Sequence, residues 1–572
     1  YASWGENDLA LDYYNKAIAS SKKYNKGNDT DLYLNNLGII EYSLSNYMKA
    51  IEYFEKALAI STKLQNEDNS GSYLNNLGLV YEAWGYYDKS LQYFEQSLKI
   101  AQDSRDKNAQ IVYLLNVGNV YAEWLKNDIA ENYYREAVGI AKELGDELSE
   151  GEILNNIGLI QMNHGLNDEA LKNLKASLDI VYKFEDKSSI GVSLMNIGSV
   201  YRGLADYDSS LKYYGQSLEI ARELGEKSQE SSNLLNIGLV YHYLTQPEKQ
   251  IEYCSQALSI ATELELQEDI SFCLTCIGWG YANLFQHSKA IEYLEGSVTY
   301  MEDLRQTAPG EIRRDYFEGL SEPYALLTYA YLGNKNIPKA FEVLERSRTK
   351  FFAEQLQESS MELNIPSVHH IQNLLSEDEA MIMYSDTEWD TIFAISITKE
   401  KIMSFGTSSD TLLSKLRAED DMSMEEAIKF YRSYLSHTSW GDKYHSMSRT
   451  FYDQLIQPLH DSLEGKEQLV IITDGVLGFL PFETFTDKNG NYLAETHTIK
   501  YIQSARIWNF IKNKNPKDKE RSLLAVGGAV YNPKTYTEEM VDNEKMLAYL
   551  ERSVFDSIST RGSLADSYAV LG

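Results

Sequence analysis

Cysteine is scarce in this chain. Its 572 residues contain three cysteines, Cys254, Cys273 and Cys276, and all three lie in one short segment. A disulfide framework of the kind that builds small secreted domains is therefore excluded. Such a low cysteine content fits the reducing cytosol, so we expect a cytoplasmic location.

Long apolar runs and positive charge are also scarce. No run of 18 apolar residues occurs, which excludes a membrane-spanning helix in this stretch. Lys and Arg number 53 against 85 Asp and Glu, for a net charge of −32. Because such a surface repels phosphate groups, direct binding to nucleic acid or to an anionic membrane is disfavoured, and a basic peptide or protein partner is favoured.

The motifs of common catalytic and cofactor sites are missing. The sequence contains no G-x-S-x-G, Walker A, G-x-G-x-x-G or H-E-x-x-H pattern. Cys273 and Cys276 form a C-x-x-C pattern, but they fall in a predicted helix and lack a second Cys/His pair at zinc-site spacing. His369 and His370 have no carboxylate pattern nearby. We therefore assign no catalytic residue, metal site or cofactor to this stretch.

What the chain does contain is a strict repeat. Apolar residues at i, i+3, i+4 and i+7 stand on both sides of a short Gly/Asn/Asp break, which predicts two amphipathic helices joined by a tight turn. Small residues such as Ala50 stand where the two helices would cross, and large ones such as Phe54 follow a turn later. Glycine marks each copy at intervals of forty residues: Gly38, Gly78, Gly118, Gly158, Gly198, Gly238 and Gly278. Residues 1–305 are thus predicted to form an α-solenoid of about eight helical hairpins.

One copy shows the unit in full. It comprises Tyr73 to Gly78, Tyr81, Trp84-Gly85, Phe94 and Ser97-Leu98. This pattern resembles the tetratricopeptide repeat, and its forty-residue period resembles the long-helix variant found in kinesin light chains and related adaptors. The resemblance implies a right-handed superhelix. Tyr1 to Gly5 aligns with Tyr81 to Gly85, so we expect the natural chain to begin further upstream.

An asparagine precedes the repeat glycine by two residues in six hairpins. These residues are Asn36, Asn76, Asn116, Asn156, Asn196 and Asn236. A primary amide offers a donor and an acceptor together, which matches the backbone of an extended peptide. In the arrays that this one resembles, the first-helix Asn faces the concave groove and clamps such a peptide, so we expect the six asparagines to bind one. The alternative is that the amides bond between neighbouring hairpins and order the stack. Cys276 ends the series at the seventh hairpin.

The pattern changes beyond the array. Residues 306–360 are predicted to form a degenerate capping hairpin with an insertion near Pro309-Gly310. Residues 361–572 then alternate short β-rich runs with helices, which indicates an α/β domain. The expected strands cover residues 380–384, 391–397, 401–405, 468–472, 498–502 and 523–527, and the expected helices roughly 424–463 and 505–512.

Five ordered motifs in this region look like landmarks of the CHAT domain. They are Phe341 to Arg348, Ile472 to Phe482, Tyr492 to Glu495, Gln503 to Ala505 and Leu523 to Gly527. The CHAT family is caspase-like and typically follows tetratricopeptide repeats. Membership implies a cysteine endopeptidase whose His-Gly and Cys follow the last of these motifs, and neither occurs before the final Gly572. We therefore expect an incomplete α/β caspase-like domain that comprises its N-terminal part.

Other candidates do not replace the missing catalytic pair. Cys254 occupies the core position of Phe54 and Phe94, and His164-Gly165 occupies a repeat turn. His497 precedes a strand and is not followed by glycine. We expect this chain to show no thiol-dependent peptidase activity.

Together these features predict a function. The repeat array is expected to bind a peptide or protein in its concave groove, and so to recruit or sense this partner for the attached caspase-like domain. The resemblance points to prokaryotic defence or regulated death. The alternative is a non-catalytic scaffold or adaptor whose α/β part serves as a pseudo-protease platform.

Overall fold

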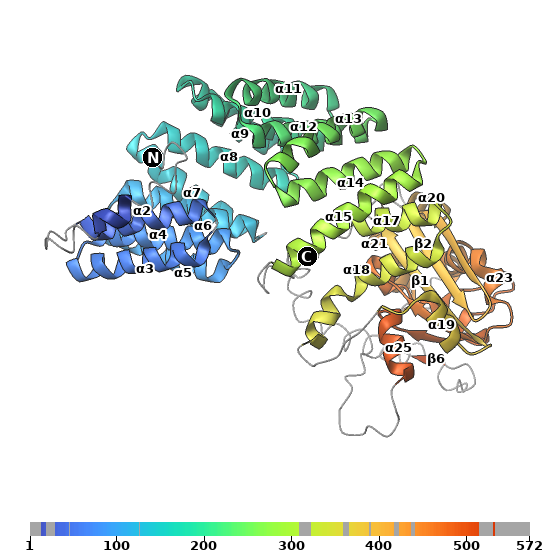
Figure 1. The fold of residues 1–572 in the computed structure, drawn as a ribbon. Helices are drawn as coiled ribbons and strands as arrows, with labels where there is room; N and C mark the ends of the chain where they lie inside the picture. The colour runs from blue at the N-terminus through green and yellow to red at the C-terminus, as the bar shows by residue number, and fades with distance from the viewer. Residues whose placement is uncertain are drawn as a thin grey trace. The chain divides into compact units, whose positions relative to one another are not determined.

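The computed structural model describes residues 13–18, 29–44, 46–124, 126–307, 322–357, 365–387, 391–416, 422–435, 441–513 and 530–531 (Figure 1). Their contacts divide the chain into two compact units. We call Tyr1–Leu284 with Gly296–Gly319 the array unit, and Phe285–Glu295 with Leu320–Gly572 the sheet unit. The expected strand at 523–527, the aligned segment at 1–5 and the insertion at 309–310 lie outside the described residues.

The array unit is a series of helical hairpins, as the repeat predicts. The first helices of the hairpins are α2 (Thr30–Ser43), α4 (Glu67–Ala83), α6 (Lys107–Glu123), α8 (Glu147–Asn163), α10 (Lys187–Gly203), α12 (Lys227–Tyr243) and α14 (Gln267–Asn283). The second helices are α3 (Tyr47–Leu64), α5 (Tyr87–Ser104), α7 (Asn127–Leu144), α9 (Asn167–Lys183), α11 (Tyr207–Leu224) and α13 (Pro247–Glu263). The residues of α15 (His287–Thr307) are divided between the two units.

Local capping chemistry sets the helix boundaries. The Asp106 side chain accepts a hydrogen bond from the backbone N–H of Ala109 at 3.1 Å and so begins α6, and Asp186 begins α10 in the same way. Gly145 and Gly225 end α7 and α11 in the left-handed conformation, with φ of 70° and 72°. This conformation turns the chain sharply after the last helical residue. The hairpins α6–α7 and α10–α11 therefore start and stop at residues that the local sequence specifies.

The repeat glycines let the two helices of a hairpin approach closely. A Cβ atom added at Gly38 would lie 2.6 Å from the ring of Phe54, and one at Gly78 would lie 2.5 Å from the ring of Phe94. Both rings are almost fully buried. The predicted seam of small residues is thus the place where an aromatic or aliphatic side chain of the second helix fills the space of a missing Cβ.

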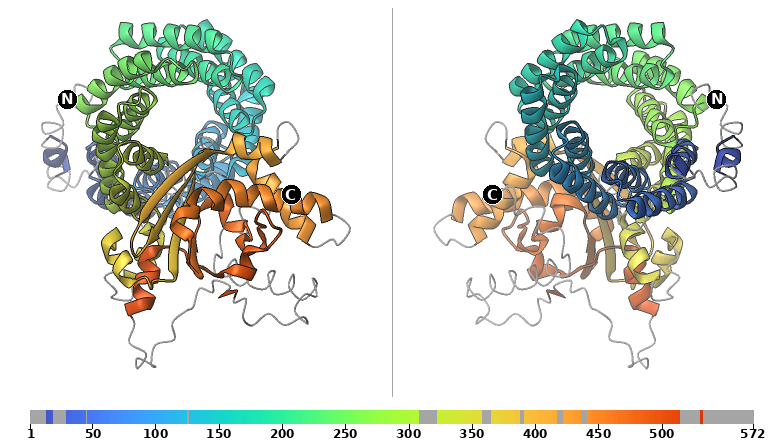
Figure 2. Two further views of the ribbon diagram at one scale, coloured as in Figure 1. Left: turned by 90° about the vertical axis from the view of Figure 1, so that its right-hand side faces the viewer. Right: turned by 90° about the vertical axis from the view of Figure 1, so that its left-hand side faces the viewer.

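Stacking of the hairpins produces a superhelix (Figure 2). Each first helix from α2 to α12 contacts the first helix of the next hairpin, whereas the second helices within the described residues do not make comparable contacts with one another. In a curved stack, the helices that pack closer together lie on the inner side of the curve. The first helices therefore form the inner side of the array unit.

The sheet unit contains a six-stranded mixed sheet. Its strands are β1 (Glu379–Thr387), β2 (Thr391–Thr398), β3 (Ile402–Ser408), β4 (Gln468–Ile472), β5 (Thr498–Tyr501) and β6 (Val530–Tyr531), in the spatial order β3-β2-β1-β4-β5-β6. Strands β1, β2 and β3 form the expected antiparallel meander. Strand β4 pairs in parallel with β1 and with β5, so three central strands end at the same edge of the sheet.

Helices cover both faces of this sheet. They are α17 (Glu322–Gly333), α18 (Ile337–Gln357), α19 (Val368–Leu374), α20 (Ser409–Leu416), α21 (Met424–Leu435), α22 (Gly441–Phe451), α23 (His460–Leu463), α24 (Leu493–Thr496) and α25 (Ala505–Asn513). The helix expected over 424–463 is broken into α21, α22, a π-helical turn (Tyr452–Ile456), a 3-10 turn (Gln457–Leu459) and α23. Pro458 lies in this break and cannot donate a backbone hydrogen bond, so a continuous α-helix is interrupted there.

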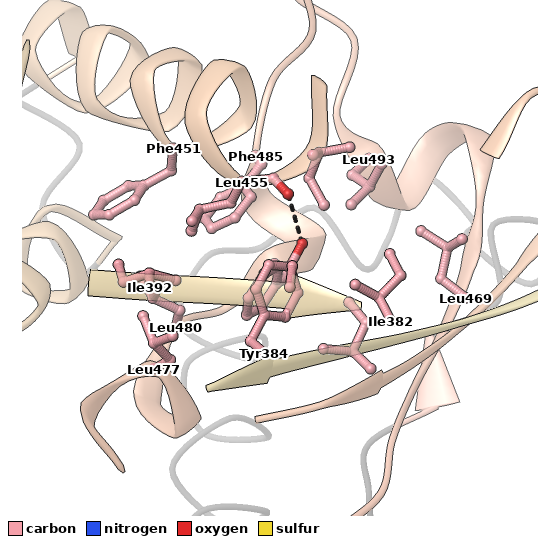
Figure 3. Close-up of a cluster of buried hydrophobic side chains, with 14 of the residues drawn as sticks. Ile382, Tyr384, Ile392, Phe451, Leu455, Leu469, Leu477, Leu480, Phe485 and Leu493 are labelled. Atoms are coloured by element: carbon pink, nitrogen blue, oxygen red, sulfur yellow. Dashed lines mark hydrogen bonds between the residues drawn. The ribbon is translucent and has the colours of Figure 1, made fainter. Parts of the chain in front are cut away.

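The pleat of the central strands separates two hydrophobic cores. Ile382 and Tyr384 of β1 point to one core, where they pack with Phe451, Leu455 and Phe485 (Figure 3). The Tyr384 hydroxyl donates a hydrogen bond to the Leu455 carbonyl at 2.7 Å. Alternate residues of the same strand enter the second core, which α18, α19 and α25 cover. Burial on both faces fits the continuously apolar sequence of a central strand.

The contacts assign α17 and α18 to the sheet unit. The domain boundaries expected from the sequence, 1–305, 306–360 and 361–572, stay predictions.

The glycine seam gives a stability prediction. Gly78→Ala should lower the free energy of unfolding of the array unit by about 2 kcal/mol, because the new methyl group collides with the Phe94 ring in a packed interface. The midpoint of urea unfolding, followed by helical circular dichroism, measures the effect.

Gly139→Ala is the matched control. Gly139 also lies inside a helix, but a Cβ there meets no atom within 4 Å. This change should raise stability by up to about 1 kcal/mol through helix propensity alone. Equal shifts in the two variants would contradict the role assigned to the seam.

Candidate functional site

Four of the six asparagines, Asn76, Asn116, Asn156 and Asn196, form a ladder of amide hydrogen bonds between neighbouring first helices. The amide of Asn76 donates to Asn35 Oδ1 at 2.7 Å, and that of Asn116 donates to Asn75 Oδ1 at 2.7 Å. Asn196 in turn donates to Asn155 Oδ1 at 2.9 Å. Each bond joins a hairpin to the preceding one. The alternative role in ordering the stack is therefore present in the structure.

The remaining three asparagines make longer contacts. Asn156 donates to Asn119 Oδ1 at 3.3 Å, and Asn36 donates to the Tyr14 hydroxyl at 3.3 Å. Asn236 accepts a hydrogen bond from Arg202 at 3.2 Å. The strength of the stacking bond thus varies along the ladder, and peptide binding by these residues stays a prediction.

The amides of the ladder keep hydrogen-bonding capacity for a ligand. In Asn76, Asn116 and Asn196 the side-chain oxygen accepts no hydrogen bond from the described part of the chain. A primary amide has two donors and an acceptor, and the stacking bond uses a single donor. The same residues can therefore order the stack and still contact a bound backbone.

Helical geometry defines the surface that carries the ladder. Positions 32, 36, 39 and 43 of α2 lie on one side of the helix, since they are spaced by three or four residues. We call these positions, and their equivalents every forty residues up to α14, the inner face. Leu32 and Ile39 are exposed there, at 42% and 46%.

Two carboxyl groups at the edge of the inner face, Glu82 and Glu123, have raised pKa values. The pKa of Glu82 in α4 is raised to about 8, first by burial and then by the nearby Glu123 of α6. Burial also raises the pKa of Glu123, although a hydrogen bond with Tyr87 of α5 opposes this shift. The pKa values of Tyr42 in α2 and Tyr134 in α7 are raised as well, first by burial and then by charges that include Glu82 and Glu123. Near neutral pH, Glu82 is therefore mostly protonated unless a cation approaches.

The sequence pattern did not single out Glu82 and Glu123. Glu82 follows the repeat tyrosine Tyr81 by one residue and Glu123 follows Tyr121 by two, each in an amphipathic helix where a charged residue normally faces solvent. Their occurrence in consecutive hairpins is the signal that was available.

The cysteines of the array are buried packing residues. Cys254 fills the space beside Gly238 in the position that Phe54 and Phe94 hold in other hairpins. Cys273 and Cys276 are buried inside α14, and burial raises the pKa of the Cys273 thiol. A thiol with a raised pKa forms little thiolate and is a poor nucleophile.

The histidines noted in the sequence lie at helix ends or in contacts between helices. His164 is the last residue before the turn at Gly165, which has φ of 72°. His497 follows α24, and burial lowers the pKa of its ring. His370 lies in α19 and contacts Asn509 of α25.

The landmark motifs of the sheet unit meet in a hydrogen-bonded network. Glu345 of α18 is fully buried and accepts hydrogen bonds from the backbone N–H groups of Ala505 and Arg506, both at 3.0 Å. These N–H groups begin α25, so the carboxylate caps that helix. Burial raises the pKa of Glu345, while Arg348 favours its charged form.

Arg348, one turn further along α18, connects two strand ends. It donates to the backbone carbonyl of Tyr384 in β1 and to Asp474 Oδ2, at 2.9 Å in the second case. The other oxygen of Asp474 accepts from the Asp386 backbone N–H at 2.9 Å. The motifs Phe341 to Arg348, Ile472 to Phe482 and Gln503 to Ala505 thus build the carboxyl edge of the parallel strands, the edge at which α/β proteins commonly bind ligands.

Family models match both units. Tetratricopeptide repeat models match residues 1–63, 29–103, 70–143, 149–223 and 231–263, and a CHAT domain model matches residues 445–559. The chain is a tetratricopeptide-repeat protein with a CHAT domain. Both resemblances seen in the sequence are confirmed, and no curated protein matches the chain.

Solved structures of helical repeat proteins are similar to the chain. BtubC from P. vanneervenii shares 18% identity over 38% of this chain and 92% of its own, with a TM-score of 0.36. The apo form of the quorum sensor NprR from B. thuringiensis shares 15% identity over 59% and 97%, with a TM-score of 0.42. A Rap protein in complex with competence and sporulation factor shares 15% identity over 52% and 86%, with a TM-score of 0.41.

Two further features are absent from the residues that the structure describes. No helix there has the length and apolar character needed to cross a membrane. No group of three or more His, Cys, Asp or Glu side chains in the same part of the chain could hold a metal ion.

The network around Glu345 gives a prediction for the CHAT domain. Glu345→Ala should destabilise the sheet unit by about 3 kcal/mol, because two buried N–H groups lose their acceptor and Arg348 loses a neighbouring opposite charge. Hydrogen exchange of the α25 amides should accelerate strongly, and mass spectrometry measures it.

Glu342→Ala on the same helix is the control. Glu342 pairs with Lys339 at the surface, so its removal should change stability by less than about 0.5 kcal/mol. Unchanged exchange of α25 in the Glu345 variant would show that this carboxylate does not hold the helix.

Proposed function

We propose that the array unit binds an extended, basic segment of a peptide or protein along its inner face. The observation that carries this proposal is the line of side-chain amides along the first helices, in which the oxygens of Asn76, Asn116 and Asn196 accept no hydrogen bond from the described residues. An extended backbone exposes alternating donors and acceptors that such amides can satisfy. Binding of this kind would recruit or sense the partner for the caspase-like CHAT domain.

The electrostatics of the inner face support a basic ligand. Burial disfavours the charged forms of Glu82 and Glu123, and Glu123 adds repulsion at Glu82, so a Lys or Arg side chain placed beside them would stabilise their charged forms. The net charge of −32 adds a long-range attraction for the same ligands. Nucleic acid, with its phosphate backbone, is disfavoured on the same grounds.

For the whole protein we propose a cytoplasmic cysteine endopeptidase in prokaryotic defence or regulated death. Support comes from the CHAT family match and from the low cysteine content. The alternative is a non-catalytic adaptor with a pseudo-protease platform. A His-Gly and a later Ser/Ala-Cys in the reading frame after Gly572 would support the protease, and their absence would support the adaptor.

Two variants of the ladder separate ligand binding from stacking. The probe is a peptide selected on the full chain from a phage library of random 16-residue sequences. Asn156→Ala should weaken its binding about fivefold with little change in melting temperature, because Asn156 makes only a 3.3 Å stacking bond. Asn116→Ala should lower both affinity and melting temperature, since its stacking bond is 2.7 Å long.

Asn167→Ala, at the start of the second helix α9, serves as the control and should leave affinity unchanged. If every ladder variant lowers the melting temperature while the folded protein binds the peptide as before, the ladder is purely architectural. Peptide capture by the inner face would then be wrong.

The pKa of Glu82 predicts how binding depends on pH. A bound cation lowers this pKa from about 8, so binding releases a proton and affinity should rise as the pH increases from 6 to 9. Isothermal titration calorimetry of the selected peptide at several pH values measures the slope. Glu82→Gln should flatten it. An identical slope in the two proteins would refute the contact between the ligand cation and this carboxyl group.

A further inference from the structure

At one position of the inner face, that of Leu32, large apolar side chains occur in every second hairpin. Leu32, Val112, Val192 and Phe272 occupy the same repeat position, eighty residues apart, and their exposed fractions are 42%, 48%, 37% and 46%. The hairpins between them have Ser72, Glu152 and Ser232 at this position. Large apolar and polar side chains therefore alternate along seven consecutive first helices.

Each of these apolar side chains is more than a third exposed. Each of the first three lies one helical turn before one of the six asparagines, on the same side of its helix. The bonds of the ladder run to the preceding hairpin from position 36 and to the following hairpin from position 35. Position 32 projects between these two directions, so its side chain is left on the open part of the inner face.

The inner-face positions themselves carry acidic but no basic residues, although Arg202 reaches this face from a neighbouring position to donate to Asn236. No Lys or Arg occurs at positions 32, 36, 39 and 43 or their equivalents in α2 to α14, whereas Glu123 and Glu152 do. The pKa of Glu152 is raised by burial and by Asp146, and no cation opposes this shift. Glu152 lies in the hairpin between those of Val112 and Val192, so an acidic position separates two apolar ones.

The spacing of the hairpins fixes the spacing of a matching ligand. Helices in contact lie about 10 Å apart, and an extended chain advances about 3.3 Å per residue, so one hairpin corresponds to about three residues. We propose that the inner face recognises an extended segment whose apolar side chains stand about six residues apart, with a Lys or Arg midway between two of them. This inference rests on the proposed function, because it requires the segment to follow the inner face.

A helical ligand fits the same surface less well. A helix advances about 1.5 Å per residue, so its apolar side chains would have to stand about 13 residues apart. Its backbone groups would also bond to one another and leave the amide oxygens of the ladder without partners. The combination of apolar positions and free amides thus favours the extended form.

Two synthetic peptides of identical composition test the spacing. Each has 15 residues, with three Leu, two Lys and otherwise Ser and Gly. The first has Leu at positions 2, 8 and 14 and Lys at positions 5 and 11, and the second has Leu at positions 2, 6 and 10. Fluorescence anisotropy with the full chain should show at least tenfold tighter binding of the first. Equal affinities would overturn the inference.

Variants of the inner face locate the contact. Val192→Ser should weaken the six-residue-spaced peptide about fivefold and leave the other peptide unaffected. Leu144→Ser, at an exposed apolar residue that ends the second helix α7, is the matched control and should change neither. Glu152→Lys should weaken the first peptide, and replacing its Lys residues with Glu should restore binding to this variant.

The outcomes separate this inference from the proposed function. If both peptides bind equally and Asn156→Ala weakens both, capture along the inner face holds and the six-residue spacing is wrong. If neither peptide binds, or if binding is indifferent to Asn156→Ala and to Val192→Ser, both are wrong. If the protein binds the first peptide more tightly and Val192→Ser abolishes this difference, the result supports both the inference and the proposed function.

Discussion

The absence of a single methyl group in each repeat controls the geometry of the array unit. Because Gly38 and Gly78 lack a Cβ, the rings of Phe54 and Phe94 can pack against the backbone of the first helix. This contact fixes the distance and crossing of the two helices in a hairpin. The first helices of neighbouring hairpins are then close enough for Asn76 to reach Asn35. The amide ladder and the inner face both depend on that proximity.

The sequence predicts the array better than it predicts the site. A forty-residue period, capping residues such as Asp106 and glycines such as Gly145 specify each hairpin locally, so the helices follow from the pattern. The hydrogen-bond partners of the asparagines do not follow from the pattern, since the bond between Asn116 and Asn75 depends on how two hairpins stack. The shifted pKa of Glu82 does not follow from the sequence pattern for the same reason, because it depends on burial in the stack and then on Glu123 from the next hairpin.

The CHAT landmarks show a similar division. Their order along the chain identifies the family, but their physical role appears only when Glu345, Asp474 and Ala505 come together from distant segments. A buried carboxylate that caps a helix and an arginine that joins two strand ends tolerate few substitutions, since either partner alone would be a buried unpaired group. The motifs that identify this domain are therefore its scaffold rather than its chemistry. Pro458 is visible in the sequence and accounts for a break that the prediction of one helix over residues 424–463 did not include.

Stacking and ligand binding by the amide ladder support each other physically. An amide that already donates to the preceding hairpin has lost most of its rotational freedom on folding, so a ligand that bonds to its oxygen loses little additional entropy. The stack thus orders the acceptors before a ligand arrives. Where the stacking bond is long, as at Asn156, the amide is less constrained and its contribution to the hairpin contact is smaller. A ladder that was needed only for architecture would have no reason to leave the acceptors of Asn76, Asn116 and Asn196 unused beside exposed apolar side chains. The inner face is best understood as a surface whose polar groups are held in place by the same bonds that hold the hairpins together.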